Sequence, residues 1–532
     1  MVTIKQTLSL QCCVIAMLSL GAGCRDSKTY GSSIKANTGA AGKSAAGSSA
    51  AAGKSAAGMS AAGMSAAGMS AAAGMSAAAG SMSSEPSGPP TKRAQDDRTF
   101  MIDETMLAFD ALPDLPETDR WTGVLDGAGY RIEVPKDWNG VLVMYAHGYV
   151  GTAPALRVTT PTALRRYLLE HKYAWAASSY TKNYYDVRAG VEDTNKLALA
   201  FKRIAGEKGR TLEEPTKRYL VGHSMGGHIT AAAIEKEAQD TAQNKVHYAA
   251  AMPMCGVTGD TELFNYFAAF QIAAEQLAGT PVSMTPADFM AVRMQVQDAL
   301  FTSYPTATTP AGDKLKAIVR NLTGGARPAF DAGFGSKQWQ DAVWATFGGD
   351  GTISGILDRA VTDTGMIVYQ MDDDPAQSDE EKKFNMDAPR SMPKADANGV
   401  RKDGLRWIPV VNGEIDIPVL SLHTLGDLYV PFRMEQVYAE RVKAKGNADH
   451  LVQRAIRGTG HCEFTYAEQV KAFEDLVAWE EKGTKPEGDD VLDRATLKKD
   501  DYGCKFTQNT YAPEEMTAGT LPMIRATLPA CP

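Results

Sequence analysis

The chain has few cysteines, few aromatic residues and little excess charge of either sign. Seven cysteines and 8% aromatic residues occur in 532 residues, and the formal net charge is −8. So few cysteines exclude a small disulfide-dense scaffold. The acidic balance argues against a nucleic-acid partner, whose phosphates require a basic surface. Beyond the extreme N-terminus there is no run of about 18 apolar residues, which excludes a polytopic membrane protein.

The N-terminus has the pattern of an export signal. Lys5 precedes an apolar stretch at 12–20 that is too short to span a bilayer. Small residues then precede Cys24, which resembles a bacterial lipoprotein signal in which this cysteine is lipidated. We predict a signal peptide at 1–23 and lipidation at Cys24, with a plain signal peptide as the alternative. The protein is then exported, and either anchored to the cell envelope, with the outer membrane favoured, or secreted. The lipid is its only expected membrane attachment.

Residues 24–97 are predicted to form a disordered tether. The unit Ser-Ala-Ala-Gly-Met/Lys recurs between about residues 39 and 90, and it offers no apolar face on which a helix could pack. Residues 53–55 (GKS) are similar to the end of a phosphate-binding loop. Ser48 stands where that loop needs its first glycine, and no strand precedes it, so a nucleotide site is excluded.

From residue 98 onward, apolar strand-like segments alternate with amphipathic helix-like segments. This alternation predicts an α/β protein with a mostly parallel central sheet covered by helices on both faces. Sites in such sheets lie at the carboxyl ends of the strands. The predicted strands are 141–146, 173–178, 218–223, 246–254, 417–423 and 451–457, and the predicted helices are 155–172, 186–206, 226–237 and 466–482.

The pattern is interrupted over residues 256–416, a segment of about 160 residues that far exceeds an ordinary connection. It contains helix-like stretches at 260–279 and 287–300 and many aromatic residues. We interpret it as a large, mainly helical cap inserted before the 417–423 strand. Its aromatic residues either shape a pocket or form only the core of the cap. The core domain then comprises 98–255 and 417–532, including a C-terminal tail.

Residues 222–226 (GHSMG) form the only GxSxG sequence of the chain. Ser224 follows a predicted strand and opens a predicted helix, which is the context of a nucleophile elbow, a tight turn that exposes the hydroxyl group. The N-terminus of the following helix favours negative charge there. We therefore predict that Ser224 is a nucleophile; the alternative is a glycine-rich turn without chemistry.

A nucleophilic serine needs a base and an acid that orients the base. His461 lies in a glycine-rich loop directly after the last predicted strand, and Asp427 follows the strand before it. The order serine, aspartate, histidine suits a sheet of this kind. Asp260 and Asp416 are the rival acids, although Asp416 precedes its strand and therefore lies at the wrong end. We predict that Asp427 and His461 complete a catalytic triad.

Negative charge that develops on a substrate oxygen needs backbone N–H donors. We expect one from Met225, directly after the nucleophile, and one from the turn after the 141–146 strand. In that turn we favour the Tyr149 N–H, with Gly148 next, while the alternative is a turn that merely ends the strand. No cofactor or metal is expected, because the chain lacks HExxH and the acidic run at 372–381 lacks calcium-loop spacing.

With these motifs in place, the chain resembles the α/β-hydrolase superfamily of the secreted serine esterase and lipase type. The matching motifs are HG at 147–148, GHSMG at 222–226, GD and VP within 426–431, and GH at 460–461. The resemblance implies a hydrolase that forms an acyl-enzyme on small-molecule or polymeric carboxylic esters. A serine peptidase of the same fold and a non-catalytic surface protein on this scaffold are the alternatives.

Four cysteines remain beyond Cys24, and in an exported chain they predict two disulfides. Three pairings are possible. We favour Cys255–Cys462, which would join two strand-end loops beside the site, and Cys504–Cys531, which would fix the tail. More loosely, Cys255 and Cys462 are similar in placement to cysteines of secreted tannase and feruloyl esterase relatives, from which the chain departs because His223, not cysteine, precedes the serine.

Overall fold

The computed structural model describes residues 94–531 except 116, 354 and 358–359. The predicted signal peptide at 1–23, the predicted lipidation site Cys24 and nearly all of the predicted tether at 24–97 lie outside the described residues. Within the described part of the chain, no helix is both long and apolar enough to cross a membrane.

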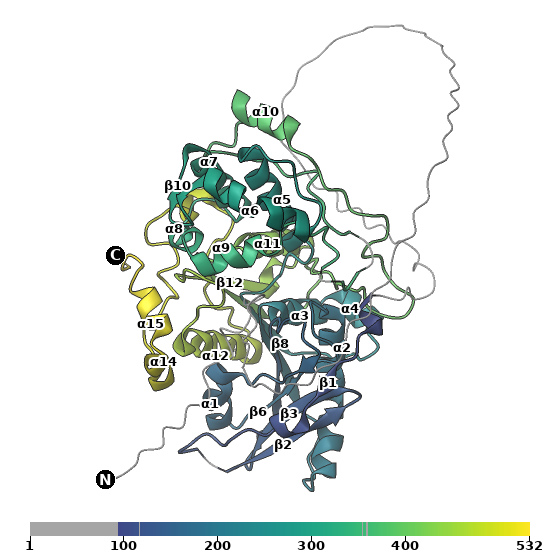
Figure 1. Ribbon diagram of the computed structural model, residues 1–532. Helices are drawn as coiled ribbons and strands as arrows, with labels where there is room; N and C mark the ends of the chain where they lie inside the picture. Colours follow the sequence, from purple (N-terminus) through teal and green to yellow (C-terminus); the bar gives the residue numbers. More distant parts are fainter. Residues whose placement is uncertain (1–93, 116, 354, 358–359, 532) are drawn as a thin grey trace, which may run out of the picture. The chain divides into compact units, whose positions relative to one another are not determined.

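An eight-stranded sheet runs through the core in the order β12-β11-β8-β7-β4-β6-β3-β2. Figure 1 labels five of its strands, β12, β8, β6, β3 and β2. All neighbouring pairs from β12 to β6 are parallel, whereas β3 is antiparallel to both of its neighbours. The strands are β2 (Thr118–Leu125), β3 (Ala128–Pro135), β4 (Val141–Ala146), β6 (Ala174–Ser178), β7 (Lys217–His223), β8 (Ala250–Met254), β11 (Val419–Thr424) and β12 (Leu451–Ile456).

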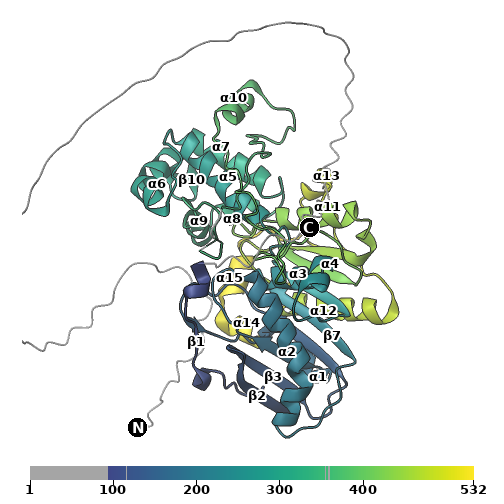
Figure 2. The ribbon, with the colours of Figure 1, turned by 90° about the vertical axis from the view of Figure 1, so that its right-hand side faces the viewer.

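Helices cover both faces of this sheet, as its apolar strands require. Side chains of β4 alternate between two cores: Leu142 and Met144 lie in one, Val143 and Tyr145 in the other. Helices α2 and α3 pack on the first face, and α1 and α12 on the second (Figure 2). The helices of this part are α1 (Thr162–Glu170), α2 (Val187–Glu207), α3 (Met225–Ala233), α4 (Lys236–Thr241), α11 (Arg433–Ala444) and α12 (Tyr466–Lys482).

Among the described residues between β8 and β11, the chain forms six helices and a short hairpin. The predicted stretches at 260–279 and 287–300 correspond to α5 and α6. Apolar residues of this inserted segment, such as Phe270 and Trp344, belong to the same core as the α2–α3 face of the sheet. The elements are α5 (Glu262–Leu277), α6 (Pro286–Leu300), β9 (Phe301–Ser303), β10 (Ala307–Thr308), α7 (Pro310–Leu322), α8 (Phe330–Phe334), α9 (Lys337–Trp344) and α10 (Asp379–Asp387).

The predicted extents of three elements are wrong. The helix predicted at 155–172 starts only at Thr162, because Ala155–Leu156 pairs with Met101–Ile102 as a two-stranded ribbon. The helix predicted at 226–237 is interrupted between α3 and α4. The strand predicted at 246–254 begins at Ala250. The remaining short elements are β1 (Met101–Ile102), β5 (Ala155–Leu156), η1 (Ala94–Asp97), η2 (Glu104–Met106), η3 (Ala448–His450), α13 (Arg494–Leu497), α14 (Pro513–Ala518) and α15 (Thr520–Arg525).

Both favoured disulfides are present. Cys255–Cys462 joins the end of β8 to the loop after β12, and Cys504–Cys531 closes the C-terminal tail. The parallel sheet with helices on both faces, entered through an antiparallel strand, confirms the expected α/β-hydrolase fold.

Candidate active site

Ser224 lies in the turn between β7 and α3, with φ 59° and ψ −121°. These angles are costly for a residue other than glycine, and they are what a nucleophile elbow imposes. The turn is so tight that a β-carbon at Gly226 would lie 2.0 Å from the Ala146 carbonyl oxygen, and one at Gly222 would lie 2.3 Å from the Gly226 oxygen. The two glycines of the motif thus let α3 approach β4 and β7 closely enough to present the serine.

The structure brings the three predicted triad residues together. His461 Nε2 lies 2.7 Å from Ser224 Oγ, and His461 Nδ1 lies 2.6 Å from Asp427 Oδ2. Because an ionised carboxylate only accepts, Nδ1 carries the proton and Nε2 is free to take one from the serine. Asp427 is fully buried, and its Oδ1 accepts from the backbone N–H groups of Tyr429 and Val430, each at 2.9 Å. The geometry therefore suits general-base activation of Ser224.

The rival acids lie elsewhere. Asp260 Oδ2 is paired with Arg441 at 2.7 Å, and its Oδ1 accepts from the Thr261 N–H. Asp416 precedes β11 and is therefore at the opposite end of that strand from Asp427. Asp427 is the carboxylate in contact with His461.

The loop that carries His461 is held by a residue that the sequence analysis missed. Glu463 Oε2 accepts from the backbone N–H groups of Thr459 and Gly460, each at 2.9 Å, and from the Thr459 hydroxyl at 3.0 Å. Thr424 at the end of β11 donates to the Gly460 carbonyl oxygen at 2.7 Å. Burial raises the pKa of Glu463 despite these donors. Its position two residues after His461 is the only signal the sequence offered.

The turn after β4 passes directly beside the nucleophile. A β-carbon at Gly148 would lie 3.1 Å from Ser224 Cβ and 3.2 Å from the His223 carbonyl oxygen. The N–H of Ser224 itself donates to the Met254 carbonyl oxygen at 2.9 Å. Met225 is the first residue of α3, where backbone N–H groups have no partner within the helix. The turn after β4 and the first turn of α3 both lie beside Ser224. The roles of the Met225 and Tyr149 N–H groups stay predictions.

His147 is part of the support for this turn rather than of the triad. Its ring stacks on Tyr180 with the ring centroids 4.1 Å apart, and the Tyr180 hydroxyl donates to the His147 carbonyl oxygen at 3.0 Å. Burial lowers the pKa of His147. The ring is therefore neutral and holds the β4 turn in place.

Aromatic residues from the inserted segment and from the acid loop surround the imidazole. Trp339 of α9 and Tyr429 meet the His461 ring edge-on at 5.8 and 5.7 Å, and they stack on each other at 6.2 Å. Phe267 of α5 lies 5.8 Å from Tyr429. Burial raises the pKa of Tyr429 to about 12, so its phenol is neutral. Trp339 is one of the aromatic residues of the predicted cap to which the sequence assigns no individual role, and Tyr429 was missed.

Backbone contacts join the inserted segment to both catalytic loops. A β-carbon at Gly333 of α8 would lie 1.8 Å from the Gly426 carbonyl oxygen and 2.8 Å from that of Thr459. The Arg327 guanidinium, which is buried, donates to the Leu425 carbonyl oxygen at 2.7 Å. The backbone of α8 is thus wedged between the loop that carries the acid and the loop that carries the base.

The described residues offer no fit for a metal at the triad. Cys255, His461 and Cys462 place possible ligand atoms within 4.8 Å of one another. The two sulfurs are joined in a disulfide, and both ring nitrogens of His461 contact triad partners. A group built this way does not fit a cation.

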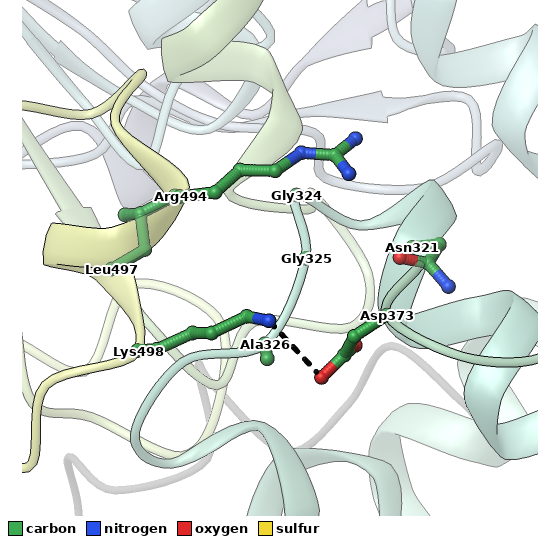
Figure 3. A pocket seen from close by; sticks show the side chains of 8 residues that line it. All are labelled: Asn321, Gly324, Gly325, Ala326, Asp373, Arg494, Leu497 and Lys498. Carbon is green, nitrogen blue, oxygen red and sulfur yellow. Dashed lines mark ion pairs between the residues drawn. The ribbon is translucent and has the colours of Figure 1, made fainter. Parts of the chain in front are cut away.

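A shallow pocket lies at the junction of α7, the acidic run and α13, and no triad residue lines it (Figure 3). Its volume of about 10 Å³ is room for one water molecule. Lys498 pairs with Asp373 across it at 3.4 Å, and Arg320 pairs with the same carboxylate at 3.0 Å. The lining residues are Asn321, Gly324, Gly325, Ala326, Asp373, Arg494, Leu497 and Lys498.

No family model matches the chain. Among curated proteins it is similar to o-phthalyl amidase of Xanthobacter agilis, with 22% identity over 424 residues, 69% of this chain and 88% of that protein. Among solved structures it is similar to feruloyl esterase B from Aspergillus oryzae, with 15% identity and a TM-score of 0.39 over 75% of this chain and 86% of that one. It is also similar to Thermogutta terrifontis esterase 2, with 13% identity and a TM-score of 0.33 over 70% and 98%.

The similarity to Pyrococcus horikoshii acylaminoacyl peptidase, with 10% identity and a TM-score of 0.34, covers 71% of this chain and 44% of that longer one. The fold of the present chain is assigned from its own strand order and connections. That fold, with a serine, a histidine and an aspartate in hydrogen-bond contact at the strand ends, is the arrangement of a serine hydrolase.

Proposed function

We propose that this protein is an exported serine hydrolase that cleaves carboxylic esters through a Ser224–His461–Asp427 triad. The observation that carries the proposal is the pair of contacts at His461, 2.7 Å to the serine hydroxyl and 2.6 Å to the aspartate. A histidine with these two neighbours is oriented by one and activates the other.

In the proposed mechanism, Ser224 Oγ attacks the substrate carbonyl while His461 Nε2 takes its proton. Asp427 holds the ring in the required tautomer and stabilises the imidazolium. The N–H groups of Met225 and Tyr149 receive the developing oxyanion. His461 then returns the proton to the leaving alcohol, and a water molecule, activated in the same way, releases the acid from Ser224.

Amide hydrolysis is the second candidate. It is favoured by the similarity to a protein named o-phthalyl amidase, which extends over most of both chains. The same triad cleaves both bonds, but an amine leaves less readily than an alcohol and depends more on protonation by His461. Esters stay our first proposal because they make the smaller demand on that step.

The rings beside His461 support a substrate with a bulky apolar group. Trp339, Tyr429 and Phe267 form a continuous aromatic set that reaches the catalytic imidazole. Apolar and aromatic walls are typical of sites that bind small molecules. We propose that the inserted segment acts as a cap whose α5 and α9 side chains contact the acyl or alcohol group.

Export is supported by the two disulfides, which persist in oxidising compartments. The lipid anchor at Cys24, and with it attachment to the cell envelope, is proposed from the sequence pattern alone. Globomycin, which blocks lipoprotein signal cleavage, should retain the uncleaved precursor if Cys24 is lipidated, and Cys24→Ala should release the protein.

The decisive test uses the full chain with p-nitrophenyl acetate, butyrate and palmitate and the matching anilides. We expect ester hydrolysis that falls by about 10⁴-fold or more in Ser224→Ala, because the covalent route is lost. Ser336→Ala is the matched control, since this serine makes no side-chain hydrogen bond at the start of α9.

The other outcomes of this test favour other functions. Anilide cleavage without ester cleavage favours the amidase candidate. Labelling of Ser224 by a fluorophosphonate without turnover of any of these substrates favours a peptidase. A folded chain that neither labels nor turns over would contradict catalysis and leave a surface protein on this scaffold.

A further inference from the structure

A second histidine, His423, lies directly behind the acid of the triad. It is on β11, four residues before Asp427, and it is fully buried. Its Nε2 lies 2.8 Å from the Val430 carbonyl oxygen and 3.9 Å from Asp427 Oδ2, the oxygen that contacts His461. The mechanism proposed above does not use this ring.

The hydrogen bonds around His423 determine its protonation. A carbonyl oxygen only accepts, so Nε2 carries a proton toward Val430. The other nitrogen, Nδ1, lies 3.4 Å from Glu435 Oε1, and among the described residues it has no partner that meets hydrogen-bond geometry. A neutral ring would turn an unprotonated nitrogen toward this carboxylate, whereas a proton on Nδ1 makes the contact an ion pair.

Both carboxylate oxygens of Glu435 accept hydrogen bonds from neutral groups. It is buried on α11, and its Oε1 accepts from the Ser421 hydroxyl at 2.6 Å. Its Oε2 accepts from Gln453 Nε2 at 2.6 Å, and the same amide group donates to the Glu435 backbone oxygen at 2.7 Å. Because both carboxylate oxygens already accept from neutral donors, Glu435 faces the His423 ring as an acceptor.

The charged groups around this pair act in the same direction. Burial alone would lower the pKa of His423, but the carboxylates of Glu435 and Asp427 and the Val430 carbonyl raise it above its ordinary value. Farther out, Arg327 and Tyr266 from the inserted segment face Asp427, and Tyr438 and Tyr502 face Glu435.

We propose that His423 is a positioning residue of the active site, a buried imidazolium that keeps Asp427 charged and in place. Its Nε2–H holds the Val430 carbonyl, and the Val430 N–H in turn donates to Asp427 Oδ1. Its charge faces Asp427 Oδ2, while Glu435 balances that charge from the far side. The effect on rate rests on the proposed function, whereas the charge of His423 is a property of the folded chain.

Two variants separate charge from shape. Glu435→Gln preserves the size of the side chain and leaves His423 bonded to Val430, but it removes the counter-charge. His423→Gln retains a donor toward Val430 and cannot be charged. His171→Gln is the control, because His171 is exposed on the other side of the sheet beside α12.

The first readout needs no activity. In ¹⁵N NMR of the histidine side chains of the full chain at pH 7.5, we expect one buried ring with both nitrogens protonated. That signal should disappear in His423→Gln and change to a singly protonated ring in Glu435→Gln. A singly protonated His423 in the unaltered chain overturns the proposal.

The second readout is the pH dependence of kcat/KM on the best ester. In His423→Gln we expect about a tenfold loss, and we expect the acid limb to move up by roughly half to one pH unit, because a positive charge that opposes protonation of His461 is gone. Glu435→Gln should move the limb in the same direction by less. His171→Gln should leave both unchanged.

A merely structural role predicts a different result. It lowers Tm and the fraction of sites that a phosphonate titrates, but the activity per titrated site and the midpoint of the acid limb stay as in the unaltered chain. That result overturns the positioning role. An unaltered chain without ester turnover or labelling contradicts the proposed function and the positioning role together, while the NMR readout still decides the charge.

Discussion

At the scale of single residues, the burial of His223, which directly precedes the nucleophile, makes the stability of the fold depend on pH. Its Nε2 lies 2.9 Å from Gln469 Oε1 and its Nδ1 lies 3.2 Å from the Tyr145 hydroxyl. Burial lowers the pKa of His223 from 6.5 to about 4. Between these values the unfolded chain binds a proton that the folded chain does not, so the stabilising contribution is present above pH 6.5 and is lost as the pH falls toward 4.

We therefore expect His223→Gln to weaken the acid sensitivity of the fold. In the unaltered chain, the shift contributes up to about 3 kcal/mol to the loss of unfolding free energy between pH 6.5 and pH 4. Urea titrations at both pH values should show a smaller difference for the variant. An identical difference in the two proteins would mean that other histidines, such as His147 and His228, carry the effect.

The triad could be predicted residue by residue because each member stands directly after a strand, in a motif that the chemistry requires. His423 and Glu435 could not. His423 lies within an apolar strand and Glu435 within an amphipathic helix, where a single polar residue has no pattern of its own. Only the packing of α11 against the sheet brings the two side chains together behind Asp427.

At the scale of elements, replacing glycine by alanine is expected to have opposite effects at two positions, one in the nucleophile elbow and one near the end of α2. Gly226→Ala places a β-carbon 2.0 Å from the Ala146 carbonyl oxygen, whereas Gly206→Ala, near the end of α2, meets nothing within 4 Å. We expect the first to destabilise the fold by about 3 kcal/mol or more, because the backbone of β4 cannot yield. We expect the second to stabilise it by about 0.5–1 kcal/mol. Thermal unfolding of both variants checks this, and a tolerated Gly226→Ala would contradict the described elbow.

Removing an aromatic side chain from α9 is expected to change the substrate preference. Trp339→Ala removes a ring 5.8 Å from His461. We expect kcat/KM to fall by about tenfold for bulky or aromatic esters and by much less for acetate, because the lost contacts are with the variable group of the substrate. Steady-state kinetics on the ester series give the answer. An equal loss on all esters would assign Trp339 to support of the His461 loop, because a β-carbon at Gly460 in that loop would lie 2.0 Å from the Trp339 indole nitrogen.

The interior strands were predicted well because they are continuous apolar runs, as strands buried on both faces must be. Strands β2 and β3 were not predicted. Their sequences carry charged residues, among them Glu133, which is fully buried in β3. Glu133 accepts from Arg165 of α1 at 2.7 Å and from the Trp175 indole at 2.8 Å. The buried Glu133 carboxylate depends on partners that are 32 and 42 residues away in the chain. The sequence around Glu133 therefore does not indicate that it lies in a buried strand.

At the scale of the whole molecule, the two disulfides are expected to contribute unequally. Cys255–Cys462 spans 207 residues and Cys504–Cys531 spans 27. The chain-entropy model gives upper values of about 5 and about 3.5 kcal/mol for loops of these lengths. Paired Cys→Ala variants should therefore lower the unfolding free energy more for the first bridge. Denaturant titrations compare them, and the reverse order would show that the tail contributes more than its loop length implies.

Only Cys255–Cys462 should also affect catalysis, because Cys462 is next to His461. Loss of this bridge is expected to lower kcat in the remaining folded protein, whereas loss of Cys504–Cys531 should leave kcat unchanged. The sequence predicted both pairings from their number and placement, and the structure contains them.

The position of α8 between the two catalytic loops limits how the inserted segment can change in evolution. Because a β-carbon at Gly333 would collide with the carbonyl oxygens of both Gly426 and Thr459, we expect that the inserted helices cannot be exchanged on their own for those of a relative. A foreign insertion would have to match both loop backbones at once. The segment that recombination could transfer intact therefore runs from the end of β8 through the loop after β12, so that a new specificity would arrive together with its own acid and base.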